Sequence, residues 1–320
     1  MTGFELYLSR SAEKFDRYLA GFFGNGTHAD MGRYLYEPVR EYTANAGKRH
    51  RPLICLLACE AVGGDAAKAW PSAAAIEHFH TAALIHDDIE DSSLTRRGEP
   101  CMHVTEGLGL AINAGDLALA LVCGTVVDDE GLDDATKLRV LAELVAMTTR
   151  TIEGQALDIG WARDDRFDLT VEDYLVMANH KTAFYSGGVP LAVGAIIGGG
   201  SERQIEELRA FGMAAGLAFQ IQDDVLNLVG GKEAKTKDFR SDLTEGKRTL
   251  VAVHALRHSA RAARLLDILS MRPDDPALLQ EAVDIMAEAD SVAFASDHAE
   301  RIILEAKAGL ADVLPPSTAR

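Results

Sequence analysis

Apolar residues recur at three- and four-residue spacing through most of the chain, which places them on one face of an α-helix. No stretch alternates with period two for long enough to predict a strand. The pattern therefore predicts an all-α fold. The helices are expected over residues 4–23, 33–46, 50–62, 69–91, 106–128, 133–160, 170–180, 182–198, 202–229, 246–258, 261–269, 276–289 and 291–312.

Two helix starts can be placed from capping patterns. Thr170 with Asp173 resembles a capping box, and Ser201 precedes an acidic first turn. No linker, low-complexity segment or repeat of fixed period interrupts the 320 residues. We therefore expect a single domain over residues 1–320, a large helical bundle in which a few long apolar helices surround a central apolar cavity.

Composition supports close-packed helices, because 48% of the residues are hydrophobic and only 6% are aromatic. The formal net charge is −17, from 49 acidic and 32 basic residues. Such a chain would repel a nucleic-acid backbone and is unsuited to an anionic membrane surface. A phosphate ligand remains possible where metal ions lie between carboxylates and phosphate.

Cysteine usage and apolar runs indicate a cytoplasmic protein. The cysteines form no CxxC pair and are expected to be buried thiols in a reducing compartment. The charged N-terminal segment predicts an amphipathic helix and not a signal peptide. The window from Leu108 to Val127 is apolar, but Asn113 and Asp116 interrupt it. It predicts a buried central helix and no stable membrane insertion. The cysteines are Cys55, Cys59, Cys101 and Cys123.

The first candidate chemistry lies at the end of the apolar run 76–92, where Asp87, Asp88 and Asp91 form a DDxxD pattern. On a helix Asp87 and Asp91 share a face. Clustered carboxylates repel one another and favour a hard divalent cation such as Mg²⁺. Arg96 and Arg97 follow and could bind the same anion. The alternative is a solvated acidic helix end followed by a basic loop.

A looser copy of the pattern shows that context decides. Asp164, Asp165 and Asp168 also fit DDxxD, but they lie in a polar connection just before Thr170. We do not expect a metal site there.

A second acidic cluster occurs in another apolar helix, where Asp223 and Asp224 are followed by Asn227. Two long apolar helices that each end in carboxylates can face one another across a bundle and hold metals between them. Basic groups that could meet a phosphate occur in residues 46–52, at Lys181 and Lys237, and in residues 245–250. Each alone is more typical of a surface.

Taken in order, these segments resemble the trans-isoprenyl (polyprenyl) diphosphate synthase family, geranylgeranyl diphosphate synthases included. The resemblance covers roughly residues 40–255 and rests on GKRHRP, DDxxD followed by RRG, GQALD, KTAFY, FQIQDD and EGKRTL. It implies an isoprenoid-synthase-type bundle, a homodimer, and Mg²⁺-dependent condensation of isopentenyl diphosphate with an allylic diphosphate.

The resemblance also implies a role for each matching residue. About three Mg²⁺ ions would be bound with the allylic diphosphate by Asp87, Asp88 and Asp91 and by Asp223 and Asp224. The allylic diphosphate would be held by Arg96, Lys181, Lys237 and Lys247. Isopentenyl diphosphate would be held by Lys48, Arg51, His80 and Arg97. The developing allylic cation would face Thr182 and Gln220, and the homoallylic chain would lie beside Phe219.

His80 has independent support, because it lies seven residues before Asp87, two turns along the same face. A lone histidine on an apolar helix is otherwise a core residue. His78 and His86 have no such support.

Three positions depart from the family pattern. Asn227 stands where many relatives have a third Asp, Thr236 precedes Lys237 where Gly is usual, and Arg240 with Ser241 occupies another Gly-rich turn. Metal affinity and loop closure could differ as a result.

Product length should depend on the helix that leads to Asp87. Ala83 and Phe79 lie about 6 and 12 Å deeper, with Ala82 beside them. Relatives that stop at fifteen carbons often have a bulky residue at the Ala82 or Ala83 level. We expect Phe79 to form the floor for a C20 product, geranylgeranyl diphosphate. Alternatively, Phe79 only packs against a neighbouring helix.

Two other functions stay open. A class I terpene cyclase, or another prenyltransferase, also ionises a diphosphate with Mg²⁺, but a cyclase needs no second diphosphate pocket. A non-catalytic partner subunit would be expected to lose its acidic residues. Residues 260–320 contain no motif that we can connect to chemistry.

Overall fold

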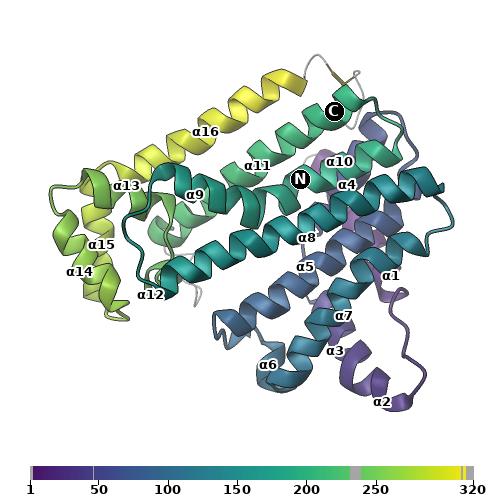
Figure 1. Ribbon diagram of the computed structural model, residues 1–320, viewed down its shortest axis with the longest axis horizontal. Coiled ribbons are helices and arrows are strands. Elements are labelled where there is room, and N and C mark those ends of the chain that lie inside the picture. The colour runs from purple at the N-terminus through teal and green to yellow at the C-terminus, as the bar shows by residue number, and fades with distance from the viewer. Residues whose placement is uncertain (1–2, 46, 231–238, 311–312, 315–320) are drawn as a thin grey trace. The chain divides into compact units, whose positions relative to one another are not determined.

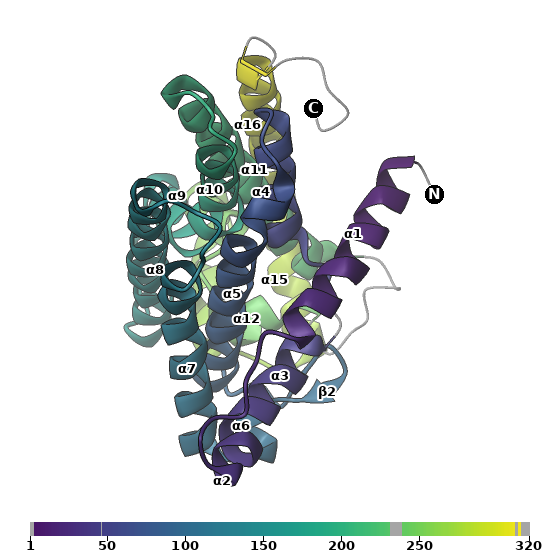
Figure 2. The same ribbon diagram turned by 90° about the vertical axis from the view of Figure 1, so that its right-hand side faces the viewer.

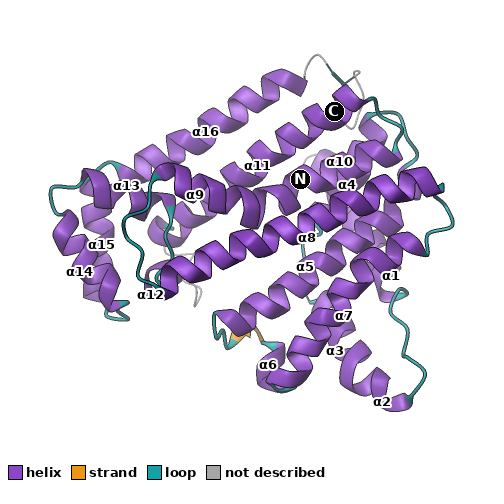
Figure 3. Ribbon diagram, in the orientation of Figure 1, coloured by secondary structure: helices purple, strands orange, loops and turns teal. Residues whose placement is uncertain are grey.

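A computed structural model of the protein describes residues 3–45, 47–230, 239–310 and 313–314. Helices make up most of this described part, with one small hairpin after α5 (Figure 3). The prediction of an all-α fold is confirmed. The first elements are α1 (Gly3–Ala20), α2 (Ala29–Met31), η1 (Gly32–Tyr36), α3 (Glu37–Ala44), α4 (His50–Ala61), η2 (Ala66–Ala69), α5 (Trp70–Glu90), β1 (Thr95–Arg96), β2 (Glu99–Pro100), α6 (Met102–Thr105) and α7 (Leu108–Val127). They are followed by α8 (Asp134–Arg163), α9 (Val171–Ala178), η3 (Asn179–Gly188), α10 (Val189–Ile197), α11 (Glu202–Val229), α12 (Ser241–Thr244), α13 (Leu250–His258), α14 (Ala262–Met271), α15 (Pro276–Glu288) and α16 (Ser291–Leu310).

The chain divides into two compact units. The first comprises Met1–Ala146, Pro190–Glu206 and Leu314–Arg320, and the second comprises Met147–Val189 and Glu207–Val313. The two Asp-rich motifs therefore lie in different units. The expectation of one domain over residues 1–320 stays a prediction.

In the first unit, α5 and α7 run side by side (Figures 1 and 2). Small residues allow the close approach: a Cβ on Gly115 of α7 would lie 2.3 Å from Nε2 of His86 on α5. Ala111, Ala114 and Ala118 of α7 are buried. This pairing fixes the helix that carries the first Asp-rich motif.

The prediction of a buried central helix for Leu108–Val127 is wrong for one face of α7. Leu108, Ile112 and Val127 are exposed, because the buried alanines occupy only the opposite face. Among the described helices, α7 alone is long and apolar enough to cross a membrane, with a mean hydropathy of 1.9. Of the apolar window, 39% is buried inside the protein.

The second unit is built around α11 and α13. Ile221 and Leu228 of α11 pack in one cluster with Tyr174 of α9 and with Leu250 and Val251 of α13. Helices α14, α15 and α16 cover α13 and complete this core. The cluster holds in place the helix that carries the second Asp-rich motif.

The predicted break between residues 180 and 182 does not exist. Helices α9, η3 and α10 follow without interruption, and η3 is a π-helix over Asn179–Gly188. Its wider turn inserts residues without ending the helix. A Cβ on Gly187 would lie 2.1 Å from the Gly212 carbonyl oxygen, so α11 approaches η3 at backbone distance. Lys181 and Thr182 consequently lie inside a helix.

Other boundaries differ less. The capping box of Thr170 with Asp173 is confirmed. Helix α13 begins at Leu250 and not near residue 246, because the Thr249 hydroxyl caps it and Gly246 adopts φ 73°. The absence of strands was predicted, yet β1 and β2 pair as an antiparallel hairpin. Positive φ at Arg97 and Gly98 makes this tight turn possible.

Candidate active site

The first Asp-rich motif lies at the C-terminal end of α5, as predicted. Asp87 is half-buried and Asp91 is the C-cap residue, whose backbone N–H donates to the Asp87 carbonyl at 2.9 Å. Asp88 is buried, with only 1% of its surface exposed. The three carboxylates therefore have different surroundings within one helical turn.

Arg96 on β1 connects two of them. Its Nη2 donates to Oδ2 of Asp87 at 2.9 Å, and its Nε donates to Oδ1 of Asp88. Burial alone would lower the pKa of Arg96, but Asp88 and Asp87 outweigh it and raise that pKa above its ordinary value. The hairpin thus presents a permanently charged guanidinium to the acidic helix end.

Asp88 is held by further donors from the protein. The Tyr42 hydroxyl donates to its Oδ2 at 2.7 Å. Burial raises the pKa of Tyr42, and the hydrogen bond to Asp88 adds to the effect. Burial and the same carboxylate raise the pKa of the Cys101 thiol to about 12. Both Asp88 oxygens therefore have protein donors, whereas Asp87 lies closer to solvent.

Positively charged side chains surround His80, which lies two turns before Asp87 on α5. Nη1 of Arg51 lies 3.3 Å from His80 Nε2. Burial, followed by the charges of Arg51, Arg97 and Arg96, lowers the pKa of His80 well below its ordinary value. His80 is consequently a neutral imidazole at pH 7. Lys48 is exposed, and Arg97 Nη1 donates to the Asn45 carbonyl at 2.7 Å.

The second Asp-rich motif, on α11, belongs to a hydrogen-bonded chain in the second unit. Thr182 Oγ1 donates to Gln220 Oε1 at 2.7 Å, and Gln220 Nε2 donates to Asp224 Oδ1 at 2.7 Å. The Tyr174 hydroxyl donates to Oδ2 of Asp224 at 2.8 Å. Burial, followed by the neighbouring Asp242, raises the pKa of Asp224. A nearby cation would relieve this repulsion.

Lys247 and Lys181 lie near these carboxylates. Nζ of Lys247 is 2.6 Å from Oε2 of Glu245 and 3.6 Å from Oδ1 of Asp242. Lys181 Nζ donates to Asp158 Oδ2. Burial raises the pKa of Asp223, and Lys247 partly opposes the rise. Two lysines predicted for the diphosphate therefore lie in ion pairs in the second unit.

Phe219, Lys237 and Asn227 were also singled out by the sequence. Phe219 is largely exposed. Lys237, together with Thr236, lies outside the described residues. Asn227 donates from Nδ2 to the Ser241 hydroxyl at 3.3 Å and accepts at Oδ1 from the Asp242 N–H at 3.4 Å. Asn227 thus contacts the segment that carries Asp242.

The wall residues for product length lie on α5. Phe79 and Ala82 are buried and Ala83 is half-buried. Their role in product length stays a prediction.

Asp164, Asp165 and Asp168 have arginine partners, as expected for a polar connection. Arg163 pairs with Asp164 at 2.7 Å, Arg166 pairs with Asp168 at 2.6 Å, and Arg272 pairs with Asp165 at 2.9 Å.

Sequence reasoning missed several residues of the site. Asp158, the last residue of the GQALD segment, accepts a hydrogen bond from Lys181 that the sequence pattern does not indicate. Asp242 lies five residues before Lys247 and raises the pKa of Asp224. Tyr42 and Tyr174 each bind the second Asp of a pair from a helix far away in sequence. A tyrosine in a helical pattern gives no signal for such a contact.

Each unit thus assembles part of the predicted site. The first unit gathers the first Asp-rich motif with Arg96, Arg97, Arg51 and His80, and the second unit gathers the second motif with Lys181, Thr182, Gln220 and Lys247. That the two motifs face one another stays a prediction.

The donor set fits Mg²⁺ if the substrate completes the coordination. Among the described residues, no three His, Cys, Asp or Glu side chains are grouped as a metal centre. Mg²⁺ is usually bound by one or two carboxylates together with substrate phosphates and water. Asp87 and Asp91 on one face of α5 match that pattern, as does Asp223.

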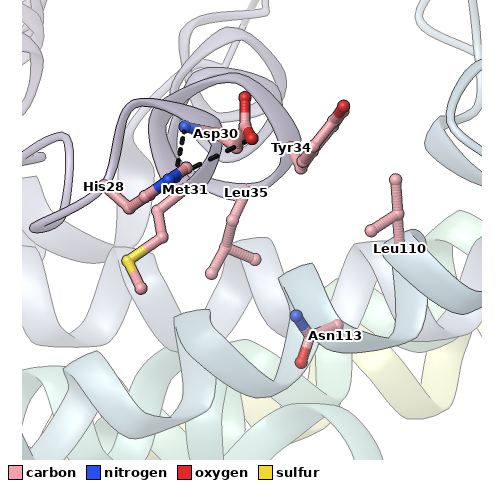
Figure 4. Close-up of a pocket in the computed structure, with 7 residues that line it drawn as sticks. All are labelled: His28, Asp30, Met31, Tyr34, Leu35, Leu110 and Asn113. Atoms are coloured by element: carbon pink, nitrogen blue, oxygen red, sulfur yellow. Dashed lines mark hydrogen bonds and ion pairs between the residues drawn. The ribbon is translucent and has the colours of Figure 1, made fainter.

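A shallow apolar pocket also occurs in the first unit, with a cavity volume of about 250 Å³ (Figure 4). Its lining contains no Arg or Lys, so it does not suit a diphosphate. The lining residues are His28, Asp30, Met31, Tyr34, Leu35, Leu110 and Asn113.

Comparison with known proteins identifies the family of this chain. The polyprenyl synthetase family profile matches residues 32–286. A short chain isoprenyl diphosphate synthase of Methanothermobacter thermautotrophicus is 41% identical over 277 residues, which is 86% of this chain and 82% of that protein. A geranylfarnesyl diphosphate synthase of Natronomonas pharaonis is 34% identical over 304 residues, 89% of this chain and 86% of that protein. The crystal structure of geranylgeranyl pyrophosphate synthetase from Pyrococcus horikoshii superimposes with a TM-score of 0.90 at 33% identity, covering 100% of this chain and 96% of that chain. This chain therefore belongs to the polyprenyl synthetase family of all-α prenyltransferases.

Proposed function

We propose that this enzyme condenses isopentenyl diphosphate with an allylic diphosphate to give a longer trans-prenyl diphosphate. The observation that carries the proposal is the arrangement of α5. Its C-terminal end presents carboxylates with Arg96, and two turns earlier His80 lies among arginines. One helix thus offers a site for a metal-bound diphosphate and a second site for a metal-free one. A cyclase needs only the first.

Different basic side chains would bind each of the two substrates. Arg96, Lys181, Lys247 and Lys237 would bind the allylic diphosphate, and Lys48, Arg51, Arg97 and His80 would bind isopentenyl diphosphate. Mg²⁺ bound at Asp87, Asp88, Asp91, Asp223 and Asp224, about three ions in all, would neutralise charge on the leaving diphosphate. Asp88 would also hold Arg96 in place.

Ionisation breaks the bond between C1 and the diphosphate oxygen and leaves an allylic carbocation, which the double bond of isopentenyl diphosphate attacks. The released diphosphate would then accept the proton whose loss forms the new double bond. Thr182 and Gln220 are hydrogen-bonded to one another at 2.7 Å, so their oxygens are oriented before substrate binds. Phe219 would lie beside the homoallylic chain. An apolar cavity keeps water from the cation.

The product that we propose is C20 geranylgeranyl diphosphate. Phe79 is buried on α5, two turns before Asp87, and the intervening Ala83 and Ala82 have small side chains. The Pyrococcus horikoshii protein is named a geranylgeranyl pyrophosphate synthetase, whereas the Natronomonas pharaonis protein is named for the longer geranylfarnesyl diphosphate.

The protein would act in the cytoplasm without nucleic acid or stable membrane insertion. Its cysteines are all free thiols, as expected in a reducing compartment. The net charge of −17 disfavours polyanions and anionic lipid.

We further propose a homodimer, supported by an exposed apolar seam on α8. Four large apolar side chains recur every seven residues along it: Leu138, Val145, Ile152 and Ile159, exposed by 70%, 54%, 56% and 39%. Ala142, Thr149 and Ala156 lie between them and are also exposed. Such a heptad seam is typical of helices that pack against a partner helix. A separate exposed apolar face on α7 contains Leu108 and Ile112.

The test is incubation of the purified protein with Mg²⁺, labelled isopentenyl diphosphate and C5, C10 or C15 allylic diphosphates, followed by sizing of the dephosphorylated products. We expect linear prenyl alcohols up to C20 that disappear with EDTA. A cyclic hydrocarbon from an allylic diphosphate alone would indicate a cyclase. No turnover with any primer would indicate a non-catalytic subunit.

A further inference from the structure

Arg49 lies between two residues predicted to bind substrate, yet its guanidinium points into the protein. Its Nη1 donates to Glu77 Oε1 at 2.6 Å, and its Nε donates to Asp16 Oδ1 at 2.6 Å. The side chains of Arg49 and Glu77 are only 3% and 4% exposed. Arg49 is thus engaged by protein partners and turned away from solvent.

The Arg49 guanidinium also holds the backbone at the start of the connection between α3 and α4. Arg49 Nη2 donates to the Thr43 carbonyl at 2.5 Å, across the connection between α3 and α4. Arg49 itself adopts φ 53°, a left-handed conformation that costs about 1 kcal/mol or more in a residue other than glycine. Packed contacts must therefore hold this residue, and the ion pair with Glu77 provides them.

The connection between α3 and α4 and the first turn of α4 carry basic side chains of the proposed isopentenyl diphosphate pocket. Lys48 precedes Arg49, and Arg51 follows it by two residues and approaches His80 at 3.3 Å. Glu77 lies three residues before His80 on α5, so the two side chains share a helix face. One face of α5 therefore holds both the anchor of the loop and the imidazole that its arginine meets.

We propose that Arg49 and Glu77 are positioning residues that set the geometry of the isopentenyl diphosphate pocket without contacting the substrate. This inference rests on the proposed function. Glu77 balances the buried charge of Arg49, and together they place Lys48 and Arg51 before any ligand arrives. The allylic diphosphate site depends on Arg96 and the Asp-rich motifs and uses none of these contacts.

Removal of one partner leaves a buried charge without its counterion, whereas replacement of both by apolar side chains is often neutral for stability. This difference separates a positioning role from a merely structural one. Glu77→Gln breaks the pair, and the double variant Arg49→Met with Glu77→Met removes it without leaving a buried charge. Asp16→Asn is the matched control, because the Asp16 side chain is 50% exposed and solvent screens its ion pair with Arg49.

The experiment measures initial rates with Mg²⁺ while isopentenyl diphosphate and a C15 allylic diphosphate are varied in turn, together with the thermal midpoint of each variant. For Glu77→Gln and the double variant we expect the KM for isopentenyl diphosphate to rise about 10- to 100-fold, because small misplacements of binding groups have effects of this size. The KM for the allylic substrate and kcat should stay near the wild-type values. Asp16→Asn should change the KM for isopentenyl diphosphate far less.

If Glu77→Gln does not fold, the KM for isopentenyl diphosphate of the double variant tests the proposal. An unchanged KM for isopentenyl diphosphate in a folded double variant would overturn the proposal. A parallel rise of both KM values with a fall of kcat would also overturn it, because that pattern indicates general disruption. Wild-type protein that elongates no primer would instead refute the proposed function itself, which keeps the two failures apart.

Discussion

Among single residues, Tyr42 offers a direct test of how the first Asp-rich motif is organised. Its hydroxyl is one of the donors to the buried Asp88 carboxylate, at 2.7 Å. Tyr42→Phe removes that donor without changing the ring, so a buried acceptor loses a partner. We expect unfolding to be easier by about 1–3 kcal/mol, measured by urea denaturation with an unchanged m-value.

Tyr34→Phe is the control for this substitution, because Tyr34 is exposed. It should leave stability within about 0.5 kcal/mol of wild type. Equal stability of the Tyr42 and Tyr34 variants would show that the contact with Asp88 contributes nothing.

Phe79 is the residue on which the proposed product length depends. Phe79→Ala should extend the product beyond C20, because it removes the proposed floor about 12 Å below Asp87. Ala83→Phe should act in the opposite direction and stop growth near C15. Both are measured by chromatography of the dephosphorylated products. A Phe79→Ala enzyme that still stops at C20 would leave Phe79 as a packing residue only.

The sequence predicted those site residues whose neighbours along the chain carry the signal. Asp87 and Asp91 end an apolar helix, and His80 lies two turns before them on one face. Tyr42 and Glu77 could not be found in this way, because their partners Asp88 and Arg49 lie 46 and 28 residues away. Only the fold brings them together, and no local pattern requires it.

At the scale of helices, periodicity predicted the helical segments but not their burial or their local winding. In α7 the apolar residues surround the helix, so the sequence did not distinguish the face that meets α5 from the exposed face of Leu108 and Ile112. The π-helix η3 was not predicted, because the spacing of apolar residues does not distinguish a short π-helical segment from an α-helix.

The contact of α8 with η3 provides a test at this scale. A Cβ on Gly154 would lie 2.2 Å from the backbone nitrogen of Lys181, which cannot retreat as a side chain can. Gly154→Ala should therefore destabilise the protein by about 1–3 kcal/mol or more. Displacement of Lys181 should also lower kcat by about tenfold or more. Urea denaturation and steady-state rates measure the two effects.

Gly160→Ala on the same helix is the matched control, since nothing lies within 4 Å of a Cβ there. Alanine is the better helix former, so this variant should be more stable by about 0.5–1 kcal/mol and equally active. If the two variants behaved alike, close packing of α8 against η3 would not be the reason for glycine at position 154.

For the whole chain, the family fold followed from an ordered set of motifs, whereas the assembly of the site did not. The two Asp-rich motifs belong to separate compact units, and each unit builds its own network of donors around one carboxylate. The sequence contains both networks only as scattered residues. That both Asp-rich motifs bind the same diphosphate therefore stays the central expectation of the proposed function.

The dimer belongs to the same scale, and Ile152 is the position at which to test it. Ile152 lies within the exposed seam of α8 with 56% of its surface accessible, so a substitution there disturbs little of the isolated chain. Ile152→Glu would place a carboxylate in a desolvated helix–helix contact if the seam is the interface. We expect sedimentation velocity to show a dimer for wild type and a monomer for this variant.

Leu304→Glu on α16 is the matched control, because Leu304 is 57% exposed and lies outside the seam, and it should remain dimeric. A dimeric Ile152→Glu protein would mean that the subunits meet elsewhere, whereas a monomeric variant with retained helicity would show that the heptad spacing of α8 exists to pair two copies of this chain.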